Sequence, residues 1–330
     1  MLLLLPENKT STIELHYWLK GGSHTMDAFV QNKCELEFLY IAKEIANTLG
    51  HDIYLETEPL AEGGIKRWFK VLVKGENKNA VITTAVTTAA ITALTVGVIV
   101  TPISTAINKT VEHIFDKLFE DEEDTKLDKE KKKWEIENLK LDAIEKSQRI
   151  QENAKIKKKR SNFYEELEKD HRIIQFSIQI KDDLKQEKSN EYNIQRVDFK
   201  KFILVNDRLD PIIDENAIIE IISPVLKKGN YKWRGIYNGE IVSFNMKSNE
   251  FKTLVQTGKI EFKNGSSINC YVEINKTLDN EGNEKISDYN IIRVNEYFEK
   301  DKSIETPEGK KHRQKREADE RQYGMFDELD

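Results

Sequence analysis

Residues 80–107 read AVITTAVTTAAITALTVGVIVTPISTAI, a run of 28 positions without one charged side chain. As a helix this run would measure about 42 Å, against a hydrocarbon core of about 30 Å in a bilayer. It is therefore long enough to cross a membrane once, at a tilt, and too short to cross twice. Eight threonines weaken its apolar character, so insertion would be only moderately favourable. We predict one transmembrane helix within residues 79–108.

Small side chains recur every four residues along this segment. They are Ala85, Ala89, Ala93 and Gly97. Such a ribbon of small residues lets helices approach closely in lipid. The threonines fall on the opposite half of a helical wheel, so a ring of helices packed by the ribbon would turn hydroxyl groups toward a narrow wet lumen. The predicted pore-lining residues are Thr84, Thr88, Thr92 and Thr95.

Other interpretations of the segment stay open. A single-pass anchor needs only the apolar length, and a buried helix of a globular domain can have a similar composition. Thr and Val also favour strands. Threonine hydroxyls can bond to carbonyls of their own helix, so the threonine stripe does not by itself establish a pore. With the segment inserted, we expect the chain at a membrane, with its soluble domains in the cytoplasm.

The rest of the chain surrounds this segment with four other regions. They are a small α+β domain at residues 1–78, a charged helical linker or stalk at 109–170, a β-rich domain at 171–300 and a disordered tail at 301–330. In the first domain, alternation and glycine stops predict strands at 12–19, 52–58 and 65–73 and a helix at about 26–49. The stalk, with its basic run at 157–160, is expected to be solvated. Asn-Gly turns at regular intervals predict that the β-rich domain is mostly antiparallel and has the form of a barrel or a sandwich. The predicted fold class is thus an α+β membrane protein with one transmembrane helix.

The composition excludes several classes of function. A net charge of −6 excludes a uniformly basic nucleic-acid binder but leaves room for a local basic site. The two cysteines, Cys34 and Cys270, and the six histidines have no metal-ligand spacing. We find no phosphate-binding glycine loop and no nucleophile–base pair. We therefore expect no enzyme activity, no metal and no cofactor.

One stretch has the composition of a ligand site. Residues 227–234 read KKGNYKWR and combine four cations with two aromatic rings at a predicted turn. Single-stranded nucleic acid is bound by this pairing, because cations follow phosphates while rings stack on bases. The predicted ligand-binding residues are Lys228, Lys232, Trp233 and Arg234. The alternative is that the two aromatic residues pack in the core while the lysines are solvated.

The layout of the chain resembles that of bacterial anti-phage membrane effectors, and in particular those of the Hailong system. The residues concerned are IELHYWL at 13–19, the Thr/Ala segment, and KGNYKWRGIYNGEIVSF at 228–244. The resemblance implies an oligomeric ion channel held closed by short single-stranded DNA oligomers, which a partner nucleotidyltransferase makes. It also implies a homo-oligomer in the lipid bilayer of the bacterial inner membrane. The alternative function is a membrane-anchored binding or adaptor module without pore activity.

Overall fold

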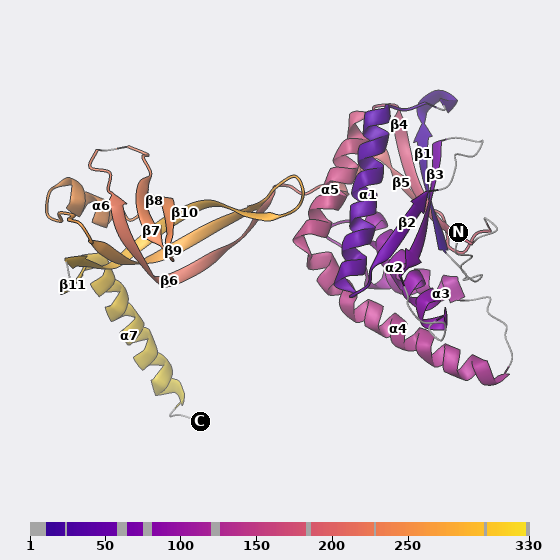
Figure 1. Ribbon diagram of the computed structural model, residues 1–330. Coiled ribbons are helices and arrows are strands. Elements are labelled where there is room, and N and C mark those ends of the chain that lie inside the picture. Colours follow the sequence, from indigo (N-terminus) through magenta and orange to yellow (C-terminus); the bar gives the residue numbers. More distant parts are fainter. Residues whose placement is uncertain are drawn as a thin grey trace, which may run out of the picture. The chain divides into compact units, whose positions relative to one another are not determined.

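The computed structural model describes residues 11–23, 25–57, 65–74, 81–119, 126–182, 186–227, 229–299 and 302–327. The chain divides into two compact units. The first contains residues 1–206 together with 280–283, and the second contains residues 207–279 together with 284–330. Each unit combines helices with a sheet of its own (Figure 1), so the α+β part of the predicted fold class is confirmed.

The first unit is built on a sheet in which five strands are described, in the order β2-β3-β1-β4-β5. Their bounds are Ser11–Leu19 (β1), Ile53–Thr57 (β2), Ile65–Val73 (β3), Ile173–Lys181 (β4) and Tyr192–Gln195 (β5). All neighbouring strands are antiparallel. The central strand β1 buries Ile13, Leu15 and Tyr17 on one face, as its alternating pattern predicts.

Helices α1 (Ala28–Thr48) and α5 (Ala154–Lys169) lie side by side along the sheet (Figure 1). Asp27 caps the start of α1, where its carboxylate accepts from the backbone amides of Phe29 and Val30. Gly50, with a φ of 80°, follows the end of α1 in the left-handed conformation that glycine adopts without strain. The predicted helix at about 26–49 is therefore confirmed to within two residues.

The apolar segment forms helix α2 (Val81–Val100), which packs against α1, α3, α4 and the sheet. Across the part of the chain that the structure describes, no helix is both long enough and apolar enough to cross a membrane. The predicted transmembrane helix at 79–108, and with it the membrane-protein fold class and the ion channel, is thus wrong. The segment has the length of a span, but its C-terminal end is bonded to the rest of the first unit.

That end of α2 is held by two buried side chains of α5. The Arg160 guanidinium, 2% exposed, donates to the carbonyls of Val98 and Thr101 at 3.3 and 3.1 Å. The Tyr164 hydroxyl donates to the carbonyl of Ile99 at 2.7 Å. The last carbonyls of a helix have no partner within it, and here α5 supplies one for each of the three.

The predicted stalk at 109–170 is also wrong, because its helices pack into the first unit. They are α3 (Asn108–Phe119), α4 (Lys126–Glu152) and α5. The 3₁₀ helix η3 (Arg196–Phe202) follows β5. A second 3₁₀ turn, η1 (Lys20–Gly22), follows β1. Ile156, Phe163 and Leu167 of α5 are buried beside the sheet, and only their spacing could have indicated this.

The second unit is a closed barrel. Its elements are β6 (Arg208–Ser223), β7 (Trp233–Tyr237), β8 (Glu240–Met246), α6 (Asn249–Gln256), β9 (Ser267–Leu278), β10 (Glu284–Glu299), β11 (Lys302–Glu305) and α7 (Pro307–Asp327). Strand β9 pairs with both β6 and β10, while β10 pairs in parallel with β8, and β8, β7 and β6 are antiparallel neighbours. The five strands β6 to β10 therefore close on themselves.

The strand order β6-β7-β8-β10-β9, with a helix between the third and fourth strands, is that of the OB-fold, a five-stranded Greek-key barrel. The Asn238-Gly239 turn joins β7 to β8 with φ values of 52° and 82°, the left-handed pair that a two-residue hairpin requires. The turn predicted from this dipeptide is confirmed. The domain is a barrel and is mostly antiparallel, as predicted, and β8 and β10 are its parallel pair.

Two predicted boundaries of this region are corrected by the structure. The β-rich domain was expected from residue 171, but β4 and β5 belong to the sheet of the first unit, so the second unit begins at Asp207. The tail at 301–330 was expected to be disordered, but it contains β11 and the helix α7 (Figure 1). Thr306 anchors the start of α7, where its hydroxyl donates to the carbonyls of Val294 and Asn295.

Candidate functional site

The predicted ligand-binding residues fall on strand β7 and the loop before it, and the structure separates them. The Trp233 ring is 1% exposed and lies in the barrel core with Phe244, Phe251 and Phe262 around it. Arg234 is exposed, and Lys232 is exposed with its ammonium 2.6 Å from the Asp288 carboxylate. Lys228 lies outside the described residues.

The alternation along β7 explains this separation. Successive side chains of a strand point to opposite faces of the sheet. Trp233 pairs with Phe244 on the inner face of the barrel, while Arg234 pairs with Ser243 on the outer face. The composition of residues 231–234, YKWR, therefore does not show that Trp233 and Arg234 lie on opposite faces. The period of two along a strand could have indicated it.

The outer faces of β7 and β8 form a continuous surface, which we call the β7–β8 face. It consists of Arg234, Ile236, Ile241, Ser243 and Asn245. Ile241, the second residue of β8, is 63% exposed on this face. In OB-folds the face of the second and third strands, which here are β7 and β8, binds oligonucleotides or oligosaccharides.

The chain around this face is basic. Residues 225–263 contain eight lysines or arginines and three acidic residues, in a chain whose net charge is −6. Among the described residues, the Arg234 guanidinium has neither a hydrogen-bond partner nor an ion-pair partner. Lys232 differs from Arg234, because its ammonium pairs with the Asp288 carboxylate. The hydrogen bond from Lys232 is the main cause that lowers the pKa of Asp288.

An exposed aromatic side chain lies in the loop before β7. Tyr231 stands two residues before the first residue of β7 and is 58% exposed. Its ring lies against Gly229, where an added Cβ would come within 2.6 Å of Tyr231 Cε2. Gly229 has a φ of 148°, so the contact and the backbone both favour glycine at this position. The sequence pointed to the aromatic pair at 231 and 233, but Tyr231 rather than Trp233 is the exposed member.

The residues predicted to line a pore or pack helices in lipid lie in the core of the first unit. Ala89, Ala93, Thr88, Thr92 and Thr95 are all buried. The side chains of Thr84 and Ala85 lie outside the part of α2 that is described. The Thr95 hydroxyl donates to the carbonyl of Ile91 in the preceding turn, at 2.7 Å.

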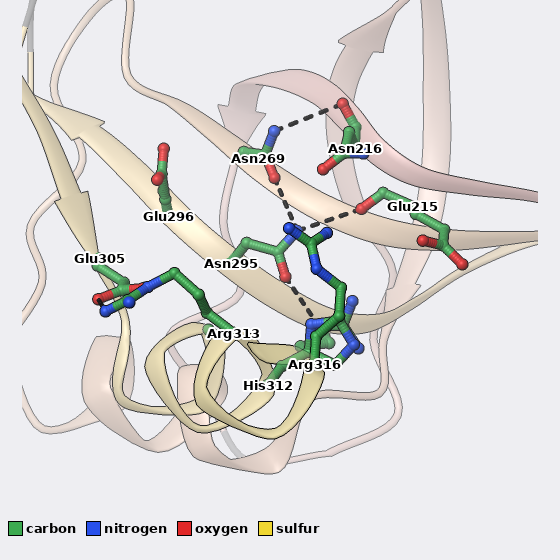
Figure 2. A pocket seen from close by; sticks show the side chains of 11 residues that line it. Glu215, Asn216, Asn269, Asn295, Glu296, Glu305, His312, Arg313 and Arg316 are labelled. Carbon is green, nitrogen blue, oxygen red and sulfur yellow. Dashed lines mark hydrogen bonds and ion pairs between the residues drawn. The ribbon is translucent and has the colours of Figure 1, made fainter. Parts of the chain in front are cut away.

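A second candidate site is a polar cavity of about 240 Å³ where α7 meets the barrel (Figure 2). Its walls come from β6, β9, β10, β11 and α7. The side chains that matter most are Asn269, Arg293, Asn295, His312 and Arg316. Asn295 is central to the wall, since its amide donates to Asn269 Oδ1 at 2.8 Å and its oxygen accepts from Arg293 Nε at 2.8 Å.

Neither site has the groups of a metal centre or a reactive thiol. Within the described ranges, no three His, Cys, Asp or Glu side chains are placed to hold a metal ion. Cys34 and Cys270 are buried free thiols, and burial raises the pKa of both. A thiol with a raised pKa is a poor nucleophile at neutral pH.

Comparison with known proteins does not add to this geometry. The chain matches no protein-family model, no curated protein and no solved structure.

Proposed function

We propose that the second unit binds single-stranded oligonucleotides on the β7–β8 face. Two independent features of that face support the proposal. Its strands occupy the second and third positions of an OB-type barrel, and the exposed Arg234 on it has no partner among the described residues. A basic groove with exposed aromatic and apolar side chains binds single strands without requiring a paired duplex.

Each part of the bound strand has a matching group on this surface. The phosphates would lie near Arg234 and near the exposed lysines Lys227 and Lys247. One base would stack on Tyr231, and others would contact Ile236 and Ile241. Ser243 offers a hydroxyl for hydrogen bonds to base edges, and Asn245 offers its side-chain oxygen, since its Nδ2 already donates to Asn290.

The ion pair between Lys232 and Asp288 limits the positive charge of the face. Both side chains are close to half exposed, so the pair contributes little stability in water. A phosphate can replace the Asp288 carboxylate as the partner of Lys232 at small cost. Asp288 would then reduce affinity, and its replacement by asparagine would raise it.

This function is recognition rather than catalysis. Short single-stranded DNA remains the oligonucleotide we propose. The role as an effector in anti-phage defence, the homo-oligomer and the partner nucleotidyltransferase rest on the resemblance described above, and they stay predictions.

The test is the binding of a fluorescent thymidine oligomer of about eight nucleotides, a typical site size for one OB-fold. Affinity is measured by anisotropy between 50 and 300 mM salt, roughly the range over which phosphate contacts weaken. Arg234→Gln should weaken binding and reduce the slope of log affinity against log salt by about 0.7, the contribution of one phosphate contact in a single strand. Lys302→Gln, on β11, removes an equal charge away from β7 and β8 and should change neither.

Tyr231 supplies the second arm of this test. Tyr231→Ala should cost about 1–3 kcal/mol of binding free energy, the usual value of a base–aromatic stack, and Tyr231→Phe should retain it. Binding that resists both Arg234→Gln and Tyr231→Ala would contradict the assignment to this face. Tighter binding of a blunt duplex than of the single strand would contradict the single-strand preference.

A further inference from the structure

The cavity beside α7 gathers cations from two elements around a set of fixed amides. Arg293 comes from β10, while His312 and Arg316 lie four residues apart on α7 and therefore on one face of that helix. Asn295 and Asn269 line the wall between them (Figure 2). The arrangement is separate from the β7–β8 face, since none of its lining residues belongs to β7 or β8.

Arg293 is held in place with its terminal nitrogens unused. Its Nε donates to Asn295 Oδ1, and its guanidinium lies 5.3 Å from the centre of the Tyr271 ring. The amide of Asn295 is fixed in turn, because it donates both to the Glu215 carbonyl at 3.2 Å and to Asn269. Among the described residues, no partner is found for the two terminal nitrogens of Arg293. They form the planar fork that binds the oxygens of an oxyanion two at a time.

The carboxylates on the β11 side of the cavity are already engaged. Glu305 accepts from Arg313 Nε at 2.9 Å and from its terminal nitrogen at 3.2 Å (Figure 2). Glu296 accepts from the Ser303 hydroxyl at 2.7 Å. Arg313 is therefore committed to its own pair. The cations left to meet an anion are Arg293, Arg316 and, when protonated, His312, while the carboxylates of Glu215 and Glu296 also line the cavity.

Arg316 is the more available of the two arginines. Its ion pair with Glu320 is 3.4 Å long, and both side chains are about two-thirds exposed. Exposed pairs of this kind contribute little and break readily. The Arg316 side chain can thus turn toward an anion in the cavity without losing a strong interaction.

His312 faces a mostly positive environment. Burial, followed by the charges of Arg293 and Arg316, lowers the pKa of its imidazole, and Glu215 of β6 opposes this shift. Lys315 of the same helix adds a further positive charge. The cations that act on His312 thus outnumber the carboxylate that opposes them.

We propose that this cavity is a binding site for a tetrahedral oxyanion, as a free phosphate or sulfate ion or as a phosphate monoester. The fork of Arg293 holds two oxygens, Arg316 a third, and His312 donates to the anion when it is protonated. A volume of about 240 Å³ accommodates such an ion with some of its water, since one water molecule occupies about 30 Å³. The proposal is independent of the oligonucleotide function of the β7–β8 face.

The test is a titration of the full chain with sulfate at constant ionic strength, followed by the NMR signals of the backbone amides around the cavity and, where it is present, of His312. Sulfate is used because its charge does not change between about pH 5 and pH 8, the range in which histidine titrates. Arg293→Gln should weaken sulfate binding about tenfold or more. Arg293→Lys keeps the charge without the fork and should recover only part of the loss. Lys311→Gln removes a cation that pairs with Glu250 instead, and should have no effect.

The pH dependence separates this site from general attraction by positive charge. Sulfate favours the protonated imidazole, so affinity should rise as pH falls through the pKa that His312 has in the bound state. It should level off below the lower pKa of the free state. His312→Gln should remove this dependence and leave the affinity at pH 8 nearly unchanged.

Two results would overturn the proposal. One is sulfate binding that is the same in Arg293→Gln and in the exposed variant Arg316→Gln as in the unchanged chain. The other is an equal effect of chloride at the same ionic strength. Because Arg316 is exposed, its replacement keeps the test valid if Arg293→Gln fails to fold. Displacement of sulfate by glycerol phosphate supports a monoester as the ligand, while sulfate binding without such displacement supports the free ion.

Discussion

Arg160 lies at the end of α2, where its guanidinium replaces solvent as the partner of two main-chain carbonyls. Burial lowers its pKa to about 10, which still leaves it charged at neutral pH. The basic run at 157–160 suggested a solvated surface. In the structure, Lys159 pairs with Glu37 of α1 at 3.2 Å, and the buried Arg160 bonds to carbonyls at the end of α2. These two side chains join α5 to α1 and α2. A charge run alone does not reveal which of its members find buried acceptors.

Replacement of Arg160 should therefore destabilise the first unit strongly. Arg160→Met fills the volume but leaves the carbonyls of Val98 and Thr101 without donors, and each buried unpaired group costs about 1–3 kcal/mol. Lys157→Met on the same helix is the matched control, since Lys157 is only half-buried. Urea unfolding of both variants measures the difference. Equal midpoints for the two variants would show that Arg160 does not hold α2.

Trp233 offers a residue-scale test of core packing against ligand stacking. Trp233→Ala should cost about 3–5 kcal/mol of unfolding free energy, because it opens a cavity among three phenylalanine rings. Trp233→Phe should fold and bind the thymidine oligomer with nearly unchanged affinity. A large loss of affinity in folded Trp233→Phe would show that Trp233 contacts the oligomer.

At the scale of elements, α2 shows why its apolar run was misassigned. Small residues at a spacing of four let two helices approach closely, whether the surroundings are lipid or a protein core. Gly97 uses this property within the chain, since a Cβ at that position would come within 2.8 Å of Val111 Cγ2 on α3. Length, threonine content and the small-residue ribbon are thus shared by a membrane span and a central helix. Only the partners of α2 distinguish the two, and these lie far away in the sequence.

The contact between α2 and α3 can be tested with paired substitutions. Gly97→Ala should destabilise the first unit by about 1–3 kcal/mol through overpacking. Val111→Ala removes the methyl group that would clash, so Gly97→Ala should cost less in that background than alone. Thermal unfolding of the two single variants and the double variant measures the coupling. Additive effects would contradict the contact.

At the scale of the whole molecule, local elements were predicted better than their pairing. The first three strands and α1 followed from alternation, a cap and glycine stops. The assignment of β4 to the second unit failed because its apolar residues, such as Phe176 and Ile178, fit any sheet, and the sequence does not show that β4 pairs with β1. Closure of the barrel likewise depends on β9 pairing on both sides. The OB-type topology, and with it the β7–β8 face, therefore became visible only in three dimensions.

The two buried thiols report on the two units separately. Cys34 lies in the first unit and Cys270 in the second. Because burial raises the pKa of both, neither should react with an alkylating reagent at pH 9, where an exposed thiol is largely ionised. Reactivity of each should instead follow the unfolding of its own unit in denaturant, measured by mass spectrometry of the labelled peptides. Labelling of either thiol at pH 9 without denaturant would contradict its burial.

The binding of a single strand to the β7–β8 face is tested most directly by photo-crosslinking the full chain to a 4-thiothymidine oligomer and locating the adducts by mass spectrometry. We predict adducts between residues 227 and 247, with Tyr231 the main position, and their loss when unlabelled thymidine oligomer is in excess. Adducts that excess oligomer removes but that lie only in the first unit or on α7 would contradict binding to the β7–β8 face.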